Sequence, residues 1–265
     1  MKLVWSKYSF DFSKRTCLMG ILNVTPDSFS DGGQYFDRAL AVKRAHEMVE
    51  EGADIIDIGG ESTRPGSEPV SLQEEIARTI PVIEALVKNI KVPVSIDTYK
   101  AEVAKRALDA GASIVNDISG LRFDPEMPKV VSQYKVPIVI MHIKGTPKNM
   151  QANPQYEALI PEIMDYFRES IMLAVESGIA EDKIIIDPGI GFGKTFEHNL
   201  EIIKNLHEFI LLEKPLLVGV SRKAFIGKIL GDAPASERLE GTAAAVAISI
   251  LNGANIIRVH DVKEM

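Results

Sequence analysis

The sequence predicts a parallel α/β barrel of eight strand–helix units, the (β/α)8 or TIM-barrel class. Short apolar runs recur along the chain, and most are continuous rather than alternating, as in strands that are buried on both faces. Helical patterns lie between the runs, and several end in a glycine just before the next run. With right-handed connections, about eight such units fit one barrel domain that spans residues 1–265.

The apolar runs give the eight expected strands in chain order. They are CLMGILNV (17–24), ADIIDIGG (53–60), VPVSID (92–97), SIVNDI (113–118), VPIVIMH (136–142), KIIIDPG (183–189), PLLVGVS (215–221) and NIIRVH (255–260). The clearest helical patterns cover 36–52, 71–89 and 98–111. Ser71 followed by Glu74 resembles a capping box at the start of the second helix.

The end of the chain departs from a regular barrel. After the eighth run only DVKEM (261–265) follows, which is too short for a closing helix. We therefore expect the eighth helix to be absent or truncated. Part of the barrel wall is then missing, or it is covered by the N-terminal segment or by a partner subunit, and the sequence leaves these alternatives open.

The composition is that of an ordinary soluble globular protein, with 46% hydrophobic and 25% charged residues. The net charge of −7 argues against a nucleic-acid-binding surface. The sequence shows neither a membrane-spanning apolar run nor the apolar core of a signal peptide. The single cysteine, Cys17, excludes an intrachain disulfide and opens an apolar run. We expect a cytoplasmic protein in which Cys17 is a buried, unreactive side chain.

Polar residues stand at the ends of the predicted strands, where the active site of such a barrel lies. Three of them offer acceptors and an amide that suit the N–H edge of a heterocycle: Asp97, Asn116 and Asp187. Five others offer cationic donors that suit phosphate or carboxylate: Arg64, Arg222, Lys223, Arg258 and His260. The predicted ligand combines a nitrogen heterocycle with an anionic group.

Two motifs are set aside. The segment 187–195, DPGIGFGKT, ends like a P-loop, but Pro188 stands where the first glycine is required. Ser221 lies in GVSRK, but Lys223 replaces the last glycine of a nucleophile elbow, and no base partner is evident in the sequence. The five histidines lack the spacing of a zinc site.

A set of long motifs closely resembles the dihydropteroate synthase family from about residue 17 onward. The motifs are NVTPDSFSDGG (23–33), GGESTRPG (59–66), SIDTYK (95–100), NDISG (116–120), DPGIGFGK (187–194), GVSRKAFIG (219–227) and RVHDV (258–262). The resemblance implies a transferase of folate biosynthesis, a target of sulfonamides. Such an enzyme condenses 6-hydroxymethyl-7,8-dihydropterin diphosphate with p-aminobenzoate to give 7,8-dihydropteroate and pyrophosphate.

The resemblance also implies a role for each matched residue. Those expected around the pterin are Asp97, Asn116, Asp187, Lys223, Arg258 stacked on the ring, and the apolar Ile118 and Met141. Those expected to form the p-aminobenzoate site are Thr63, Pro65, Phe29, Phe192 and Ser221. Asn23 would help to hold Mg²⁺ with the diphosphate, whose phosphate oxygens would contact Arg64, Arg258 and His260.

The implied reaction is a substitution at the pterin methylene with loss of pyrophosphate, by a dissociative course that needs no protein nucleophile. Two loops, 23–33 and 61–69, would close over the substrates and bring Asp27 and Arg64 to them. The residues implied in catalysis are Lys223, Asp97, Asp187, Arg64 and Asp27. The family resemblance also implies a homodimer.

Two other functions fit part of the pattern. A pterin-binding methyltransferase domain that acts on methyltetrahydrofolate would share the barrel and the Asp/Asn pterin site. A non-catalytic pterin-binding module would need the same residues but no leaving-group machinery. The motifs NVTPDSFSDGG and STRPG, with SRK ahead of RVH, favour the synthase.

Overall fold

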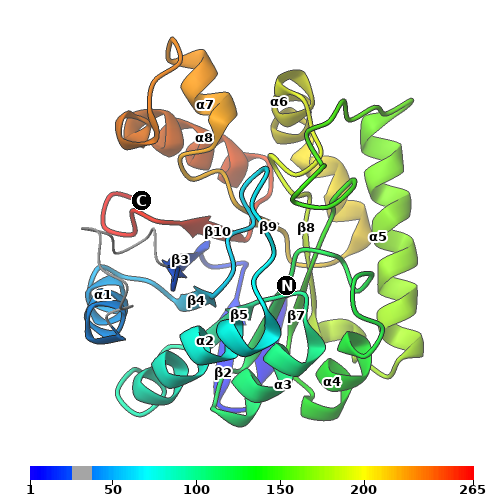
Figure 1. The fold of residues 1–265 in the computed structure, drawn as a ribbon. Helices are drawn as coiled ribbons and strands as arrows, with labels where there is room; N and C mark the ends of the chain where they lie inside the picture. The colour runs from blue at the N-terminus through cyan, green and yellow to red at the C-terminus, as the bar shows by residue number, and fades with distance from the viewer. Residues whose placement is uncertain (26–37) are drawn as a thin grey trace.

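Eight parallel strands form a nearly closed barrel in the computed structural model, which describes residues 1–25 and 38–265 (Figure 1). The strands are β3 (Cys17–Asn23), β4 (Ile55–Gly59), β5 (Val94–Asp97), β6 (Ile114–Asp117), β7 (Ile138–Met141), β8 (Ile184–Asp187), β9 (Leu217–Val218) and β10 (Ile256–Val259). Their order is β8-β7-β6-β5-β4-β3-β10-β9, and one parallel bridge, Ile186 to Leu216, links the two ends of the sheet. The predicted fold class is confirmed, with a strand in each of the eight apolar runs.

Helices surround the strands on the outside (Figure 1). They are α1 (Arg38–Glu50), α2 (Leu72–Leu86), α3 (Ala101–Asp109), α4 (Met127–Tyr134), α5 (Leu159–Glu176), α6 (Phe196–Lys204), α7 (Ala224–Ile229) and α8 (Leu239–Leu251). Short 3₁₀ turns cover η2 (Glu181–Lys183), η3 (Leu206–Leu212) and η4 (Ala235–Glu237). The three helices predicted first along the chain correspond to α1, α2 and α3.

The predicted capping box of α2 is half formed. The Ser71 hydroxyl accepts a hydrogen bond from the backbone N–H of Glu74 at 3.2 Å, which satisfies one of the free donors at the helix start. The Glu74 carboxylate pairs with Arg78 one turn later instead of reaching back to Ser71. A full capping box is present at α6, where Thr195 and His198 exchange both bonds.

Two apolar layers hold the barrel together. The larger layer lies between the strands and the helices, and the smaller one fills the barrel interior, where alternate strand residues such as Met19, Ile55 and Val139 meet. A hairpin that the sequence analysis does not predict, β1 (Lys2–Trp5) paired with β2 (Tyr8–Asp11), adds Leu3 and Trp5 to the interior cluster.

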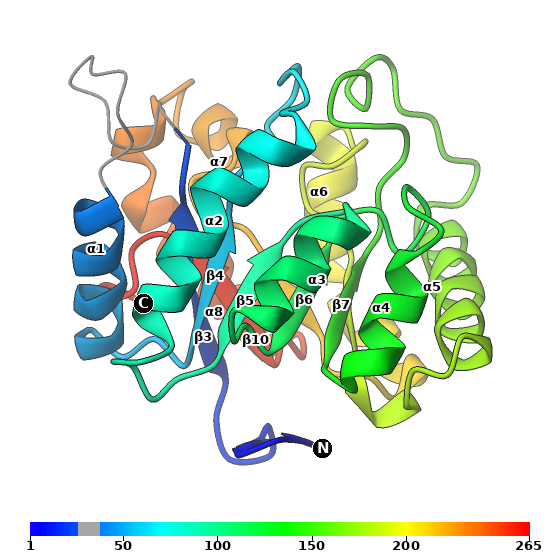
Figure 2. The same cartoon turned by 60° about the horizontal axis from the view of Figure 1, so that its bottom comes forward.

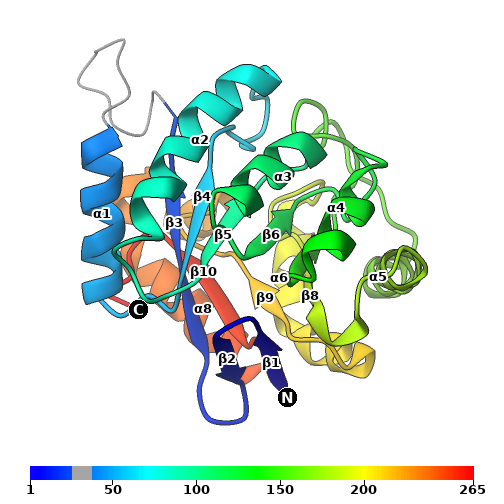
Figure 3. The ribbon, with the colours of Figure 1, turned by 90° about the horizontal axis from the view of Figure 1, so that it is seen from below.

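The hairpin lies beneath the barrel, at the amino-terminal ends of the strands (Figures 2 and 3). It covers Cys17 at the start of β3, whose side chain is 2% exposed. Burial raises the pKa of the Cys17 thiol to about 11, so the expectation of an unreactive cysteine agrees with its position.

The six residues that follow β10, 260–265, form no helix. Val262 nevertheless packs beside β3, because Gly20 has no side chain and a Cβ there would lie 3.0 Å from the sulfur of Met48 and 3.2 Å from Val262. The N-terminal segment does not cover this side of the barrel, since the β1–β2 hairpin lies beneath it. Among the residues described here, no helix is both long and apolar enough to cross a membrane.

Candidate active site

The strand register gathers polar side chains at the carboxyl-terminal rim. Asn23 on β3 lies opposite Gly59 on β4, Gly59 opposite Asp97 on β5, and Asp97 opposite Asn116 on β6. A side chain at Gly59 would lie 3.5 Å from the Cβ of Asp97 and 3.8 Å from the amide oxygen of Asn23. Glycine at this position therefore leaves open space between two of the predicted site residues.

Arg258 reaches this layer from lower in the barrel, since its strand pairs near the start of β3. Its Nη2 donates to Asp97 at 2.7 Å, and its Nε donates to Asp57 at 2.6 Å. Burial raises the pKa of Asp97 above its usual range, although the guanidinium opposes the shift. One oxygen of Asp97 is buried without a hydrogen-bond partner among the described residues, so the layer has a free acceptor.

Asp57 is a residue that the sequence analysis missed. It is fully buried in the middle of β4, and its Oδ2 accepts from Asn116 Nδ2 at 3.0 Å as well as from Arg258. The available signal was a carboxylate within the apolar run ADIIDIGG, because an ionisable group in a buried strand requires a partner.

Asp187 and Lys223 lie on the other side of the rim. Asp187 ends β8, and its carboxylate accepts from the backbone N–H of Gly189 at 2.7 Å. Lys223 precedes α7, with its Nζ 4.4 Å from the ring centroid of Phe192. Burial lowers the pKa of Lys223 to about 8, an effect that the nearby carboxylate of Asp187 opposes.

A small apolar cluster borders these polar groups. Ile118 and Met141, both expected to pack around the heterocycle, are buried together with Ile143 and Met150. The partly buried Phe192 packs against the same cluster, as does Tyr99. The rim therefore combines a hydrogen-bonding layer with apolar walls, the usual make-up of a small-molecule site.

Ser221 and His260 form a pair that the sequence does not reveal, because they are far apart along the chain. The Ser221 hydroxyl lies 2.9 Å from His260 Nδ1 and accepts from the His260 backbone N–H at 3.2 Å. Burial, reinforced by the charges of Arg258 and Arg222, lowers the pKa of His260 to about 4. His260 is therefore neutral near pH 7 and can serve as a hydrogen-bonding group rather than as a cation.

Arg222 is held by Asp261 in a two-point ion pair, with Nε donating at 2.8 Å. Its backbone has a φ of 55°, which costs energy for a residue with a side chain and is held here by a bond from Arg222 N to Thr242. The Arg222 guanidinium is thus occupied by an ion pair with Asp261 and is not free to bind an anionic ligand.

The second loop, 61–69, carries the half-buried Thr63 and the exposed Arg64 and Pro65. Its base is fastened by Glu61, whose Oε2 accepts from the backbone N–H of Val70 at 2.9 Å and from Lys100 Nζ at 2.6 Å. These contacts of Glu61 fix both ends of the loop and leave its middle residues beside the rim.

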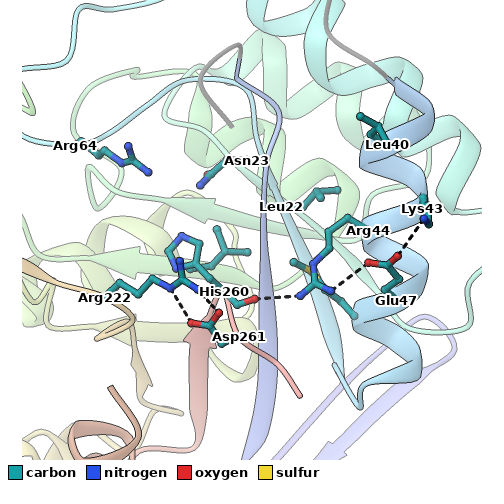
Figure 4. Close-up of a pocket in the computed structure, with 12 residues that line it drawn as sticks. Leu22, Asn23, Leu40, Lys43, Arg44, Glu47, Arg64, Arg222, His260 and Asp261 are labelled. Carbon is teal, nitrogen blue, oxygen red and sulfur yellow. Dashed lines mark hydrogen bonds and ion pairs between the residues drawn. The ribbon is translucent and has the colours of Figure 1, made fainter. Parts of the chain in front are cut away.

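Arg64, Asn23 and His260 extend toward one open region (Figure 4). They line a cavity of about 620 Å³ together with Arg222 and residues of β3 and α1. On its α1 side Arg44 is paired with Glu47 and Glu51, so its charge is already balanced. Lys43 also pairs with Glu47, and Arg222 with Asp261, so among the described lining residues Arg64 is the cationic side chain without an ion-pair partner.

The loop after β8 is not a P-loop. Gly189, Gly191 and Gly193 all have positive φ values, from 64° to 83°, which fold the segment back against the loop after β7. Lys194 is buried rather than exposed for phosphate, and its Nζ lies 2.9 Å from His142 Nδ1. Burial lowers the pKa of Lys194 well below its usual range. His142 is itself buried and packs against the ring of Tyr166.

Two predicted site residues, Asp27 and Phe29, lie outside the described residues. Within the described part of the chain, no group of three His, Cys, Asp or Glu side chains could hold a metal ion. Asn23 supplies an amide oxygen at the rim, which suits a Mg²⁺ ion bound mainly by water and phosphate oxygens.

Known proteins resemble this chain over almost its whole length. A family model described as "Pterin binding enzyme" matches residues 19–260. The chain is 53% identical to the dihydropteroate synthase of Synechocystis sp. over 97% of this chain and 89% of that protein. It is 47% identical to the dihydropteroate synthase of Escherichia coli strain K12, over 100% and 93% of the two chains.

Solved structures agree with these relatives. The dihydropteroate synthase of Yersinia pestis, solved with a sulfonamide drug complex, superposes with a TM-score of 0.94 at 45% identity, covering 100% of this chain and 95% of that one. The dihydropteroate synthase of Xanthomonas albilineans, solved with 4-aminobenzoic acid, gives 0.93 at 40% identity, covering 99% and 93%.

Proposed function

The chain belongs to the dihydropteroate synthase family of pterin-binding enzymes, and from this membership we propose how its residues divide the reaction between them. The family's reaction joins a pterin diphosphate to p-aminobenzoate, and a relative has been solved with 7,8-dihydropteroate. The function predicted from the motifs is thereby confirmed. The two alternatives, a methyltransferase domain and a non-catalytic module, are not supported by the relatives.

The pterin is assigned to the layer of Asp97, Asn116 and Asp187. The observation that carries this assignment is the unpaired, buried oxygen of Asp97, since a buried acceptor without a donor costs about 1–3 kcal/mol and a pterin N–H would satisfy it. The apolar cluster of Ile118 and Met141 would flank the ring. Lys223 would stand at the ring edge beside Asp187.

The p-aminobenzoate is assigned to the space between the second loop and Phe192. Thr63, Pro65 and Ser221 would surround it, with Phe29 as a further member from outside the described residues. The Lys223 ammonium lies over the Phe192 ring, so the proposed p-aminobenzoate site adjoins the proposed pterin site. The arylamine nitrogen would therefore lie close to the pterin methylene. The resemblance to a relative solved with 4-aminobenzoic acid supports the assignment.

In the proposed mechanism the C–O bond between the pterin methylene and the diphosphate breaks, and a C–N bond to the arylamine forms. The diphosphate leaves with the bonding electron pair, and the arylamine nitrogen loses a proton. Asp97 and Asp187 would stabilise the positive charge that spreads through the pterin ring. Arg64 and Asp27 would meet the leaving group as the loops close, and His260 and Arg258 would contact phosphate oxygens.

Mg²⁺ is the proposed cofactor. Asn23 would hold it together with the diphosphate, and the ion would neutralise the charge of the leaving group. A single amide oxygen from the described residues is consistent with an ion that keeps most of its water and phosphate ligands.

A homodimer is the proposed assembly. The helix α8 exposes Ala244, Ala247, Ile248 and Leu251, which share one face because they are spaced by three or four residues. Leu251 is 86% exposed, and Ile210 and Leu211 on η3 add further exposed apolar surface. A contiguous apolar face of this kind is typical of a protein–protein contact.

A sulfonamide tests the division of the two substrate sites. Initial rates are measured against p-aminobenzoate and against the pterin diphosphate at several sulfonamide concentrations. Competition with p-aminobenzoate, without competition with the pterin diphosphate, is expected. Competition with the pterin diphosphate alone would place the arylamine site elsewhere.

A further inference from the structure

We propose that Asp57 is a positioning residue for pterin binding, whose carboxylate fixes Arg258 and Asn116 in the orientations in which they meet the pterin. The inference rests on the proposed function, because it takes Asn116, Asp97 and Arg258 as pterin contacts. Asp57 lies two residues before Gly59 in β4, one layer below the rim, and its side chain is fully buried. It acts through its neighbours rather than by touching the substrate.

One oxygen of Asp57 joins three strands. Oδ2 accepts from Arg258 Nε on β10 at 2.6 Å and from Asn116 Nδ2 on β6 at 3.0 Å. A buried carboxylate is tolerated only where it is paired and hydrogen-bonded, so these two donors are a condition of its burial. Conversely, both donors depend on Asp57 for their orientation.

The hydrogen bond to Asp57 fixes the orientation of the Asn116 side-chain amide. An ionised carboxylate only accepts hydrogen bonds, so the Asn116 side chain must turn its NH₂ group toward Asp57. The carbonyl oxygen is then left for another donor. The layer beside Asp97 thereby presents acceptors to a pterin, which carries N–H donors along one edge.

Asp57 also gives the Arg258 guanidinium a second ion-pair partner besides Asp97. The guanidinium divides between Asp57 and Asp97, with donors 2.6 and 2.7 Å from the two carboxylates. A pterin N–H can then bind the free Oδ1 of Asp97 while Asp57 and Asp97 Oδ2 hold the guanidinium in place. Without Asp57 the guanidinium would be free to turn its Nε toward Asp97 Oδ1 and would compete with the ligand for that oxygen.

Asp117 provides a matched control. It follows Asn116 on β6, is as fully buried as Asp57, and its carboxylate accepts from the backbone N–H groups of Ser119 and Leu121. It therefore anchors a loop rather than a side chain of the rim. Asp117→Asn should cost stability without changing pterin affinity.

The experiment compares Asp57→Asn, Asp117→Asn and the wild-type enzyme. Calorimetry with 6-hydroxymethyl-7,8-dihydropterin diphosphate and Mg²⁺, without p-aminobenzoate, gives pterin affinity, and steady-state rates give the KM of p-aminobenzoate. For Asp57→Asn we expect pterin affinity to fall at least about 10-fold while the KM of p-aminobenzoate changes less than about 2-fold. Unchanged pterin affinity, or equal losses for both substrates, would overturn the inference.

Folding is checked by circular dichroism and thermal melting, with Asp57→Ser as a second variant that must show the same split. If neither Asp57 variant folds while Asp117→Asn does, Asp57 is a structural residue and the inference fails. A wild-type chain that binds no pterin diphosphate would overturn the proposed function, and the inference with it. If the wild-type enzyme binds the pterin diphosphate and Asp57→Asn binds it equally well, only the inference is overturned and the proposed function stands.

Discussion

Single side chains at the rim owe their properties to burial. Lys223, Asp97 and Asp187 each stand where water is largely excluded, so the charged form of each is penalised. The penalty lowers the pKa of the lysine and raises that of the carboxylates. The pKa of Lys223 falls to about 8 and that of Asp97 rises to about 7, so we expect activity to depend on pH near neutrality.

The pH dependence of kcat/KM for the pterin diphosphate should have two limbs. Lys223 is charged below its pKa of about 8, so activity that needs the ammonium falls above that pH. Asp97 is charged above its raised pKa, so activity that needs the carboxylate falls on the acid side. In Lys223→Arg the guanidinium stays charged, and the alkaline limb should disappear from whatever activity remains. An unchanged alkaline limb would show that another group causes it.

Removal of the Lys223 ammonium should abolish most turnover and leave the fold intact. We expect Lys223→Ala to lower kcat by at least about 100-fold, as for other charged groups that act on a developing transition state. Lys228→Ala is the matched control, because Lys228 lies five residues later, is exposed and stands over the Phe196 ring at 4.5 Å. Near wild-type turnover in Lys223→Ala, measured by dihydropteroate formation, would remove its assigned role.

For single residues, the sequence predicts site residues that end a strand better than it predicts buried residues that position other side chains. Asp97, Asn116 and Asp187 could be selected because each is the polar end of an apolar run. Asp57 was missed because it lies within a run, and its partner Arg258 is 201 residues away. The pairing of Ser221 with His260 likewise exists only after β9 and β10 are placed side by side.

Among the elements, the second loop is held by side chains of two neighbouring helical segments. Lys100 Nζ, at the start of α3, joins Glu61 of the loop to Glu75 of α2, at 2.6 Å from each carboxylate. It also donates to the backbone oxygen of Val70 at 2.7 Å, and Tyr99 donates to Glu61 at 2.6 Å. The loop that carries Thr63 and Arg64 is thus fixed by an ion-pair network whose two carboxylates are buried.

Weakening this network should impair p-aminobenzoate use more than pterin binding. Glu61→Gln is expected to raise the KM of p-aminobenzoate at least about 5-fold, because small displacements of a substrate loop are costly. Glu68→Gln, in the same loop but exposed and paired only with Lys148 among the described residues, should behave like the wild type. Steady-state kinetics with each substrate varied measures the difference, and a larger change in pterin KM would contradict the assignment of the loop.

The strands were predictable because each is a continuous apolar run, but their lengths were not. The run 215–221 yields only the two-residue strand β9, since the chain turns at Ser221 to place Lys223 before α7. The β1–β2 hairpin was missed because its first strand alternates exposed and buried residues over only four positions. Such a short alternation is decided by what it packs on, which here is the bottom of the barrel.

For the whole molecule, the regular recurrence of apolar runs was sufficient to predict the barrel. Eight strands in one parallel order follow from it, because each connection carries a covering helix. The single domain over residues 1–265 and the cytoplasmic location stay predictions. The assembly could not be predicted from periodicity, because α8 is apolar on nearly every face and only packing shows which face is left exposed.

The proposed homodimer predicts a change in mass when the α8 face is charged. Leu251→Asp should give a monomer, because a carboxylate buried in an apolar contact is costly. Met172→Asp on α5 is the matched control, since Met172 is 57% exposed on a different helix and should leave the assembly unchanged. Light scattering after size-exclusion chromatography gives the masses. A monomeric wild type, or a Leu251→Asp variant that keeps the dimer mass, would contradict the assignment.

The most direct measurement is pyrophosphate release from 6-hydroxymethyl-7,8-dihydropterin diphosphate in the presence of Mg²⁺, with and without p-aminobenzoate. We expect release to depend on p-aminobenzoate and to match the 7,8-dihydropteroate formed, mole for mole. Tight binding of the pterin diphosphate without product would contradict the proposed synthase, and would leave a rim that binds pterin without catalysing its transfer.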